Sequence, residues 1–222
     1  MPVAWDVIRT ERLALVDWLA TLSPEQWATP SLCEGWSVMH VAAHLAWAPV
    51  LSPPRLATGL ARAGLRPNRF ARDSAVRWAA RGVPAVLAQL RTNATNDVGP
   101  VGVPREAVLV EAVVHALDVR RPLGSRRAIP AAAFGPAADF CAAARWPVSA
   151  LLGGAAGRRT AGVRLVATDQ KWSHGEGPEV HGTGETLLLL LSGRSLCAEE
   201  LQGEGAPEVR TRLGEEQTGA RS

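Results

Sequence analysis

One stretch, residues 104–120 (PREAVLVEAVVHALDVR), decides the fold of the N-terminal part of this chain. Between Ala107 and Leu117 every residue is apolar except Glu111 and His115. A helix that is apolar on all sides is normally buried on most of its faces, and a proline in the first turn, here Pro104, is typical of a helix start. The sequence therefore predicts a buried helix within a helical domain.

Glu111 and His115 are the informative residues of this helix. Their spacing of four places both side chains on one face. Because an isolated ionised carboxylate is very costly to bury, Glu111 needs a partner or must hold a proton. Two interpretations are open at this point: an ordinary Glu–His ion pair on a helix face, or a divalent metal held between the carboxylate and the imidazole.

A further metal ligand is available from residues 38–47, a predicted helix that carries His40 and His44. Two helices packed antiparallel would bring His44, Glu111 and His115 to one point. Two histidines and a carboxylate with an open fourth position match a catalytic zinc site, or an open site for iron or nickel. We expect His40 to be a fourth ligand or a residue that orients water or substrate; the alternative is a partly exposed residue at the helix start.

The rest of the chain divides into a helical part and a mixed part. Hydrophobic spacing and helix-start signals predict further helices in the first part, at residues 3–22, 56–65, 69–90 (interrupted at Pro84) and 131–152, and a short helical turn that starts at residues 23–25. After a glycine-rich linker, the pattern predicts strands at 163–168 and 209–213 and a helix at 185–191. We therefore expect an α+β protein with a helical domain (1–153), a small α/β domain (158–214) and a disordered tail (215–222).

Composition excludes several classes of protein. The 222 residues are 47% hydrophobic and 20% charged, which is typical of a globular chain. No apolar run approaches the roughly 18–20 residues that span a bilayer, and the charged residues near the N-terminus argue against a signal peptide. Three widely spaced cysteines (Cys33, Cys141 and Cys197) favour neither a disulfide framework nor a zinc site built from cysteines, so we expect a cytoplasmic protein with reduced thiols. For Cys33 a small packed residue is the default interpretation.

Charge is distributed unevenly along the chain. Up to Thr160 there are 18 arginines and 11 acidic residues, whereas from Ala161 onward there are 6 basic and 10 acidic residues. Residues 55–81 contain seven arginines and a single acidic residue, Asp73. Most of this cluster is expected to be a solvated face, but Arg72 is expected to hold a substrate carboxylate through a bidentate contact. Nucleic-acid binding ranks last, because no recognisable motif accompanies the arginines.

Three segments resemble one known family. They are residues 32–38 (LCEGWSV) with 41–45 (VAAHL), residues 111–118 (EAVVHALD), and a C-terminal part that includes residues 166–169 (VATD). Together they are similar to the mycothiol-dependent maleylpyruvate isomerase family, which comprises DinB-like metalloproteins of actinobacteria. The resemblance implies an up-down four-helix bundle followed by a small α/β domain.

The resemblance also implies a site and a cosubstrate. His44, Glu111 and His115 would bind the metal, zinc first and nickel or iron as alternatives, and mycothiol would be the thiol cosubstrate. The sequence departs from the family at His40, where an aspartate is common, and this places the substrate in doubt. No nucleic-acid or membrane partner is expected, and the chain would be a monomer or a homodimer.

The function predicted from these observations is metal-dependent thiol chemistry. A bound cation favours a thiolate at neutral pH, and that nucleophile would isomerise or substitute a small, electrophilic, anionic substrate. Family members act as isomerases, as thiol transferases or in unassigned roles, so an isomerase and an S-transferase are both open. The alternative from another class is a non-enzymatic protein in which the site senses a metal or a ligand.

Overall fold

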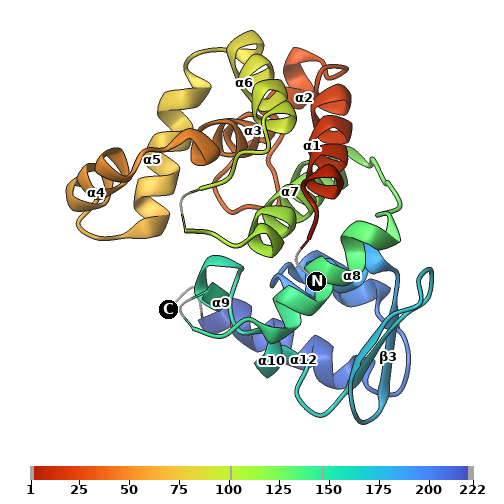
Figure 1. Cartoon of the computed structure of the whole chain (residues 1–222). Coiled ribbons are helices and arrows are strands. Elements are labelled where there is room, and N and C mark those ends of the chain that lie inside the picture. Colours follow the sequence, from red (N-terminus) through yellow and green to blue (C-terminus); the bar gives the residue numbers. More distant parts are fainter. Residues whose placement is uncertain (1–2, 101, 147, 220–222) are drawn as a thin grey trace. The chain divides into compact units, whose positions relative to one another are not determined.

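The computed structural model describes residues 3–100, 102–146 and 148–219, and it divides the chain into two compact units, residues 1–126 and 127–222. The first unit is helical (Figure 1). It contains α1 (Trp5–Leu19), α2 (Pro24–Ala28), α3 (Val38–Trp47), η1 (Ala48–Val50), α4 (Pro53–Arg62), α5 (Pro67–Ala79), α6 (Val83–Thr95), α7 (Arg105–Arg120) and η2 (Arg121–Leu123).

Four helices form the core of this unit. Each of α1, α3, α6 and α7 packs against two of the others, in the order α1–α6–α3–α7 and back to α1. The buried side chains between them are mostly aliphatic, and they include Leu15 and Leu19 of α1, Val41 of α3, Leu90 of α6 and Val119 of α7. Burying each such side chain contributes roughly 1.5–3 kcal/mol. This arrangement confirms the predicted four-helix bundle.

Local signals in the sequence fix where the site-bearing helix α3 begins. Ser37 is its N-cap: the Ser37 hydroxyl accepts a hydrogen bond from the backbone N–H of His40. In return, Nδ1 of the His40 ring accepts the backbone N–H of Ser37 at 3.2 Å. Reciprocal capping of this kind satisfies two backbone donors that the helix itself leaves unpaired. The cap therefore sets the register of α3 and with it the position of His44, two turns further on.

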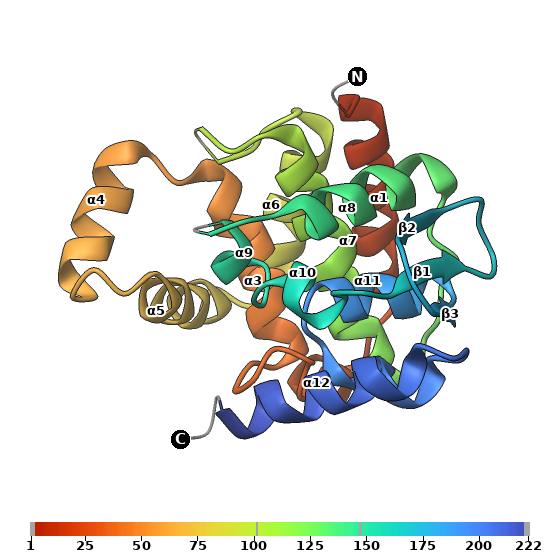
Figure 2. The same ribbon diagram turned by 90° about the horizontal axis from the view of Figure 1, so that it is seen from below.

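Helices α4 and α5 lie outside the four-helix core. α5 packs against α3, and α4 packs against α5 without burying any residue of its own. Figure 2 shows α4 at the edge of the unit, with α5 next to it. The two helices approach closely at Gly59, where a Cβ would lie only 2.0 Å from the Phe70 ring. Glycine is therefore the residue type that this contact requires.

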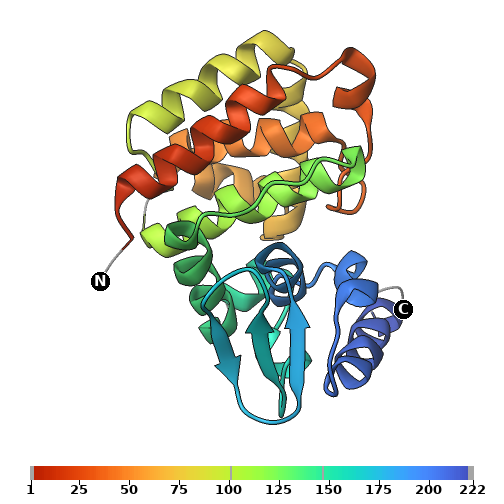
Figure 3. The same ribbon diagram turned by 90° about the vertical axis from the view of Figure 1, so that its right-hand side faces the viewer.

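The second unit is built on a three-stranded sheet, seen in Figure 3. Its strand order is β2–β1–β3, with β1 antiparallel to β2 and parallel to β3. All eight residues of α11 are buried. The elements of the unit are α8 (Ala131–Ala143), α9 (Val148–Leu151), α10 (Ala156–Arg159), β1 (Arg164–Ala167), β2 (Ser173–Gly175), β3 (Glu179–Gly182), α11 (Gly184–Leu191), η3 (Ser195–Glu200) and α12 (Ala206–Gly219).

The structure confirms the α+β class and corrects three details. The unit boundary lies at residues 126–127, so α8 belongs to the second unit, whereas the sequence analysis expected a first domain of 1–153 and a second of 158–214. The strand predicted at 209–213 is wrong, because these residues belong to α12. The expected tail, 215–222, is helical as far as Gly219, and its last three residues lie outside the described part of the chain. Among the described residues, no helix is long and apolar enough to cross a membrane.

Candidate metal centre

Helices α3 and α7 bring two of the three predicted metal ligands into direct contact. Nε2 of His44 lies 3.2 Å from Oε1 of Glu111. The two side chains are 16% and 20% exposed, so they are shielded but not sealed from solvent. Two atoms bound at about 2.0–2.2 Å to one tetrahedral metal are roughly 3.3–3.6 Å apart. The observed separation therefore suits a hydrogen bond and also suits two ligands of one cation.

The third predicted ligand, His115, lies beside this pair, and Asp118 binds its Nδ1. Its ring centroid is 5.3 Å from that of His44, in an edge-on arrangement. Its Nδ1 lies 2.8 Å from Oδ2 of Asp118, whose side chain is fully buried. Because an ionised carboxylate only accepts hydrogen bonds, Nδ1 carries the proton in this contact. Nε2 is then the nitrogen with a free lone pair, which is the form that binds a metal.

Cys33 meets the same carboxylate from the loop before α3. Its thiol donates to Oδ2 of Asp118 at 3.1 Å, and its sulfur lies 3.8 Å from Nδ1 of His115. Among the described residues, Cys33, His115 and Asp118 are the group whose potential ligand atoms all lie within 4.8 Å of one another. The predicted trio does not meet that criterion. His115 thus belongs to two candidate ligand sets. Cys33 contacts both His115 and Asp118, so it does more than the packing that the sequence analysis expected of it.

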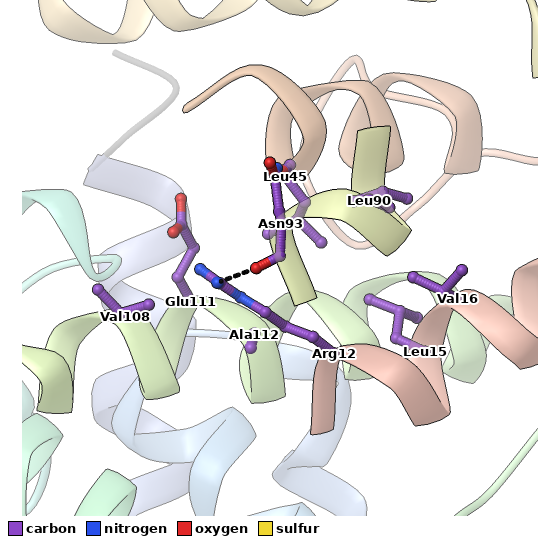
Figure 4. Close-up of a pocket in the computed structure, with 9 residues that line it drawn as sticks. All are labelled: Arg12, Leu15, Val16, Leu45, Leu90, Asn93, Val108, Glu111 and Ala112. Atoms are coloured by element: carbon purple, nitrogen blue, oxygen red, sulfur yellow. Dashed lines mark hydrogen bonds between the residues drawn. The ribbon is translucent and has the colours of Figure 1, made fainter. Parts of the chain in front are cut away.

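The charge of Glu111 has three partners inside the bundle. Burial by itself raises the pKa of Glu111, but the hydrogen bond and charge of His44 and the charges of His115 and Arg12 outweigh it, so that its pKa is lowered. Arg12 and Glu111 both line a small cavity of about 10 Å³, and Figure 4 shows the Arg12 guanidinium beside the Glu111 side chain. The guanidinium also donates to the backbone oxygens of Asn93 at 3.1 Å and Val98 at 2.7 Å. Glu111 is therefore held ionised without a metal.

Aromatic rings enclose His44 on two sides. The Trp36 and Trp47 rings lie edge-on to it, with centroid separations of 5.4 and 5.7 Å. Nδ1 of His44 is buried and has no hydrogen-bond partner, which is a costly state for a ring nitrogen. The rings leave His44 little freedom to turn and exclude water from its Nδ1 side. This confinement keeps Nε2 directed at Glu111.

The two remaining predicted site residues lie on different elements. His40, in the first turn of α3, uses Nδ1 in the cap of that helix, as described above. Arg72 of α5 is exposed, and its Nη2 lies 3.4 Å from the position that a Cβ would take at Gly35, in the loop that carries Cys33 and Trp36. Among the described residues, Arg72 has no hydrogen-bond or ion-pair partner. A guanidinium at this place is free to bind an anion.

The donor set fits a divalent cation. Imidazole nitrogens and a carboxylate suit zinc, iron and nickel. The fit also rests on two observations: the 3.2 Å contact between His44 and Glu111, and the proton that Asp118 holds on Nδ1 of His115. A buried carboxylate that orients a histidine in this way is a common support of metal ligands.

Comparison with known families assigns this part of the chain. Residues 8–98 match the family model for the mycothiol maleylpyruvate isomerase N-terminal domain. Residues 8–98 of the first unit are therefore similar to the N-terminal domain of this family. The match includes three residues that surround the site, namely Cys33, His44 and Arg72, and it ends before α7 begins. The structure packs α7 into the same four-helix bundle as the helices of the matched segment.

Two solved structures align with most of the chain. They are crystal structures of a mycothiol-dependent maleylpyruvate isomerase and of a mutant of that enzyme in which a histidine is replaced by alanine. Each is 16% identical to this chain, with TM-scores of 0.44 and 0.45 respectively. Each alignment covers 91% of this chain and 92% of the other. A search of curated proteins found no match.

Sequence reasoning gave no supporting role to three residues beside the site, although two of them, Cys33 and Asp118, lie in the segments that resemble the family. Arg12 lies on α1, about a hundred positions from Glu111, and no local pattern marks it as the partner of that carboxylate. Asp118 was visible as an acidic residue three positions after His115 on an otherwise apolar helix, which is a usable signal. Cys33 had no signal beyond its place in the loop before the His44 helix.

Proposed function

We propose that the first unit binds a divalent metal through His44, Glu111 and His115 and uses it in thiol-dependent chemistry on a small anionic electrophile. The proposal is carried by one observation: His44 and Glu111 are in contact, and His115 stands beside them with its Nδ1 proton held by Asp118. Two histidines and one carboxylate leave a coordination position open for a cosubstrate. Zinc is the first choice of metal, with nickel or iron as alternatives.

Exposure favours this ligand set over the set that contains Cys33. His44, Glu111 and His115 are each 16–20% exposed, whereas Asp118 is fully buried. A catalytic cation needs a face that substrate can reach, and a cation beside Asp118 would lie on the closed side of His115. We therefore assign Asp118 to the orientation of His115 and place Cys33 next to the site rather than among its ligands.

In the mechanism that we propose, the protein residues bind and orient the reactants. When bound, the cation supplies the charge that keeps a coordinated thiol, such as that of mycothiol, in its thiolate form at neutral pH. Trp36 and Trp47 limit access of water to the His44 side of the site. Arg72, unpartnered beside the loop that carries Trp36, binds a carboxylate of the electrophile. His40, capped against Ser37 through Nδ1, is proposed to orient substrate or water through its other nitrogen.

Turnover by the metal-loaded protein tests this proposal. The protein is incubated with mycothiol and maleylpyruvate, and the isomer ratio is followed by chromatography; in parallel it is offered mycothiol with a panel of alkylating electrophiles. Isomerisation or thiol transfer that disappears in Arg72→Gln and is lost on chelation of the metal supports the proposal. A protein that binds metal through these ligands but is inert across the panel would instead be a non-enzymatic metal- or ligand-binding protein.

A further inference from the structure

A second feature of the first unit is a cavity of about 520 Å³ between η1, α4 and α5. Its volume lies within the range of about 300–1,000 Å³ that is usual for small-molecule sites. None of the three proposed metal ligands lines it. The cavity combines two kinds of side chain: the aromatic residues Trp47, Phe70 and Trp78, and the guanidinium groups of Arg55, Arg62 and Arg77.

The charge around the cavity is strongly positive. Asp73 is the one acidic residue among those that line it, and its carboxylate lies 3.8 Å from Nε of Arg69. Arg77 donates to the hydroxyl of Ser74 at 2.8 Å, whereas Arg55 and Arg62 have no ion pair within the described part of the chain. Unpaired charges of one sign along a concave, partly apolar wall concentrate the electrostatic field there. The cavity therefore attracts anions.

The aromatic wall of the cavity favours a flat, apolar ligand. Trp47 and Phe70 meet edge-on, with ring centroids 5.4 Å apart. Trp47 is 95% buried, since its relative exposure is 5%, and its indole Nε1 is buried without a hydrogen-bond partner. An indole N–H normally finds a partner when it is buried. Trp47 thus contributes ring surface to the cavity wall, whereas its Nε1 is itself closed off from solvent.

The cavity owes its shape to a contact that only glycine permits. At Gly59 a Cβ would lie 2.0 Å from the Phe70 ring. The backbone of α4 can therefore pack directly against this aromatic side chain of the cavity wall. α4 buries none of its residues, and its exposed face carries Arg55 and Arg62. The helix thus contributes little packing of its own and instead places two unpaired guanidinium groups at the mouth of the cavity.

We propose that this cavity binds a carboxylate with a flat, conjugated or aromatic body, with the carboxylate on Arg55 and Arg62 and the body against Trp47 and Phe70. The proposal goes beyond the metal centre and does not depend on it, since the residues that carry it are not metal ligands. A guanidinium pairs with a carboxylate through two parallel hydrogen bonds, and aromatic faces accept a flat apolar body. Neither group alone selects this class of ligand; the combination does.

Calorimetric titration with trans-cinnamate tests the proposal, with cinnamyl alcohol as the neutral ligand of the same shape. The full-length protein is titrated twice, once after chelator treatment and once loaded with zinc. We expect cinnamate to bind with one-to-one stoichiometry in both states and at least tenfold more tightly than the alcohol. Equal affinities for the two ligands, or no binding of cinnamate, would overturn the proposal.

Charge-removing variants locate the site. Arg55→Gln and Arg62→Gln are each expected to weaken cinnamate binding at least threefold, which is the scale of a partly exposed ion pair. Arg66→Gln is the matched control, because Arg66 is an exposed arginine of the same basic segment that does not line the cavity. An equal loss in Arg66→Gln would mean that the field of the whole segment, and not this cavity, attracts the anion.

A third variant tests the aromatic wall. Trp47→Phe keeps an aromatic ring but removes the unsatisfied N–H, and it is expected to leave the charge preference unchanged while altering affinity for the cinnamate body. Circular dichroism checks that each variant is folded. If the metal is not bound as proposed while zinc-free protein still binds cinnamate, the metal proposal fails and this one stands.

Discussion

Replacing Asp118 with asparagine is expected to weaken metal binding without removing a ligand. Asp118 is fully buried and its Oδ2 accepts hydrogen bonds from both Nδ1 of His115 and the Cys33 thiol. The substitution keeps the shape but removes the charge that favours the proton on Nδ1. Losses of about 10–100-fold in metal affinity are usual for such supporting residues. At about 1.36 kcal/mol per factor of ten, this corresponds to roughly 1.4–2.7 kcal/mol of binding free energy.

The assay is competition for zinc between the protein and a chromophoric chelator. Asp17→Asn is the control, because Asp17 is an exposed carboxylate of the same unit that pairs with Arg91 at 2.7 Å. That surface pair is worth about 0.2–1 kcal/mol to stability, and its loss is expected to leave zinc affinity unchanged. An unchanged affinity in Asp118→Asn would refute the orienting role, and complete loss of metal would make Asp118 a ligand. Thermal melting of the metal-free variants separates either result from misfolding.

Three further predictions concern other residues of the chain. Glu111→Gln is expected to reduce zinc affinity by more than Asp118→Asn does, because it removes a proposed ligand; equal affinities in the same chelator assay would count against ligation. His40→Ala is expected to lower the free energy of unfolding by about 1 kcal/mol through loss of its cap with Ser37, and to lower turnover while metal content stays the same, as measured by denaturant titration and elemental analysis. Burial raises the pKa of the Cys141 thiol to about 12, so a thiol reagent at pH 8 is expected to label Cys33 but not Cys141 in the folded protein, which mass spectrometry reads directly.

The Cys141 pKa also predicts a pH dependence of stability. In the unfolded chain this thiol ionises near its ordinary value of 9.0, whereas in the folded protein it keeps its proton up to about pH 12. As pH rises through this window, ionisation stabilises only the unfolded chain, so the free energy of unfolding falls. Cys141→Ala is expected to make stability less dependent on pH above 9, as measured by denaturant titration at several pH values.

Much of the helical framework is predictable because local signals agree with burial. Ser37 marks the start of α3, and the apolar run of α7 marks a helix buried on most faces. The strand predicted at 209–213 failed because five residues are too few to separate the two periodicities. Val209 and Leu213 fit an alternating strand, but they are also four apart, and both are buried on one face of α12.

The unit boundary was mispredicted because a glycine-rich composition was interpreted as a linker. Residues 153–157 instead lead into α10, where Arg159 is fully buried and donates to the backbone oxygens of Leu190 and Leu191. A buried arginine satisfied in this way belongs to a packed core. The true boundary, at residues 126–127, lies just after the Pro122 and Gly124 signals that end the α7 region.

The candidate site was predictable in part. The spacing of Glu111 and His115 and the position of His44 on a separate helix identified the contact that the structure shows between His44 and Glu111. Asp118, three positions after His115 on the same helix, could have been predicted as its partner. The roles of Arg12 and Cys33 could not, because these residues reach the site from separate elements through packing. The orientation of the two histidine rings also depends on packing. Asp118 holds Nδ1 of His115 in a hydrogen bond, and the Trp36 ring packs against His44.

X-ray absorption spectroscopy of the zinc-loaded protein at the zinc edge, without added thiol, tests the assignment of the ligands most directly. Nitrogen and oxygen ligands lie about 2.0–2.2 Å from zinc, whereas a thiolate sulfur lies at about 2.3 Å and scatters more strongly. Ligation by His44, Glu111 and His115 predicts a shell of nitrogen and oxygen alone, with sulfur appearing only when a low-molecular-weight thiol is added. A sulfur ligand present from the outset, and lost in Cys33→Ala, would place the metal in the set that contains Cys33 and contradict the account.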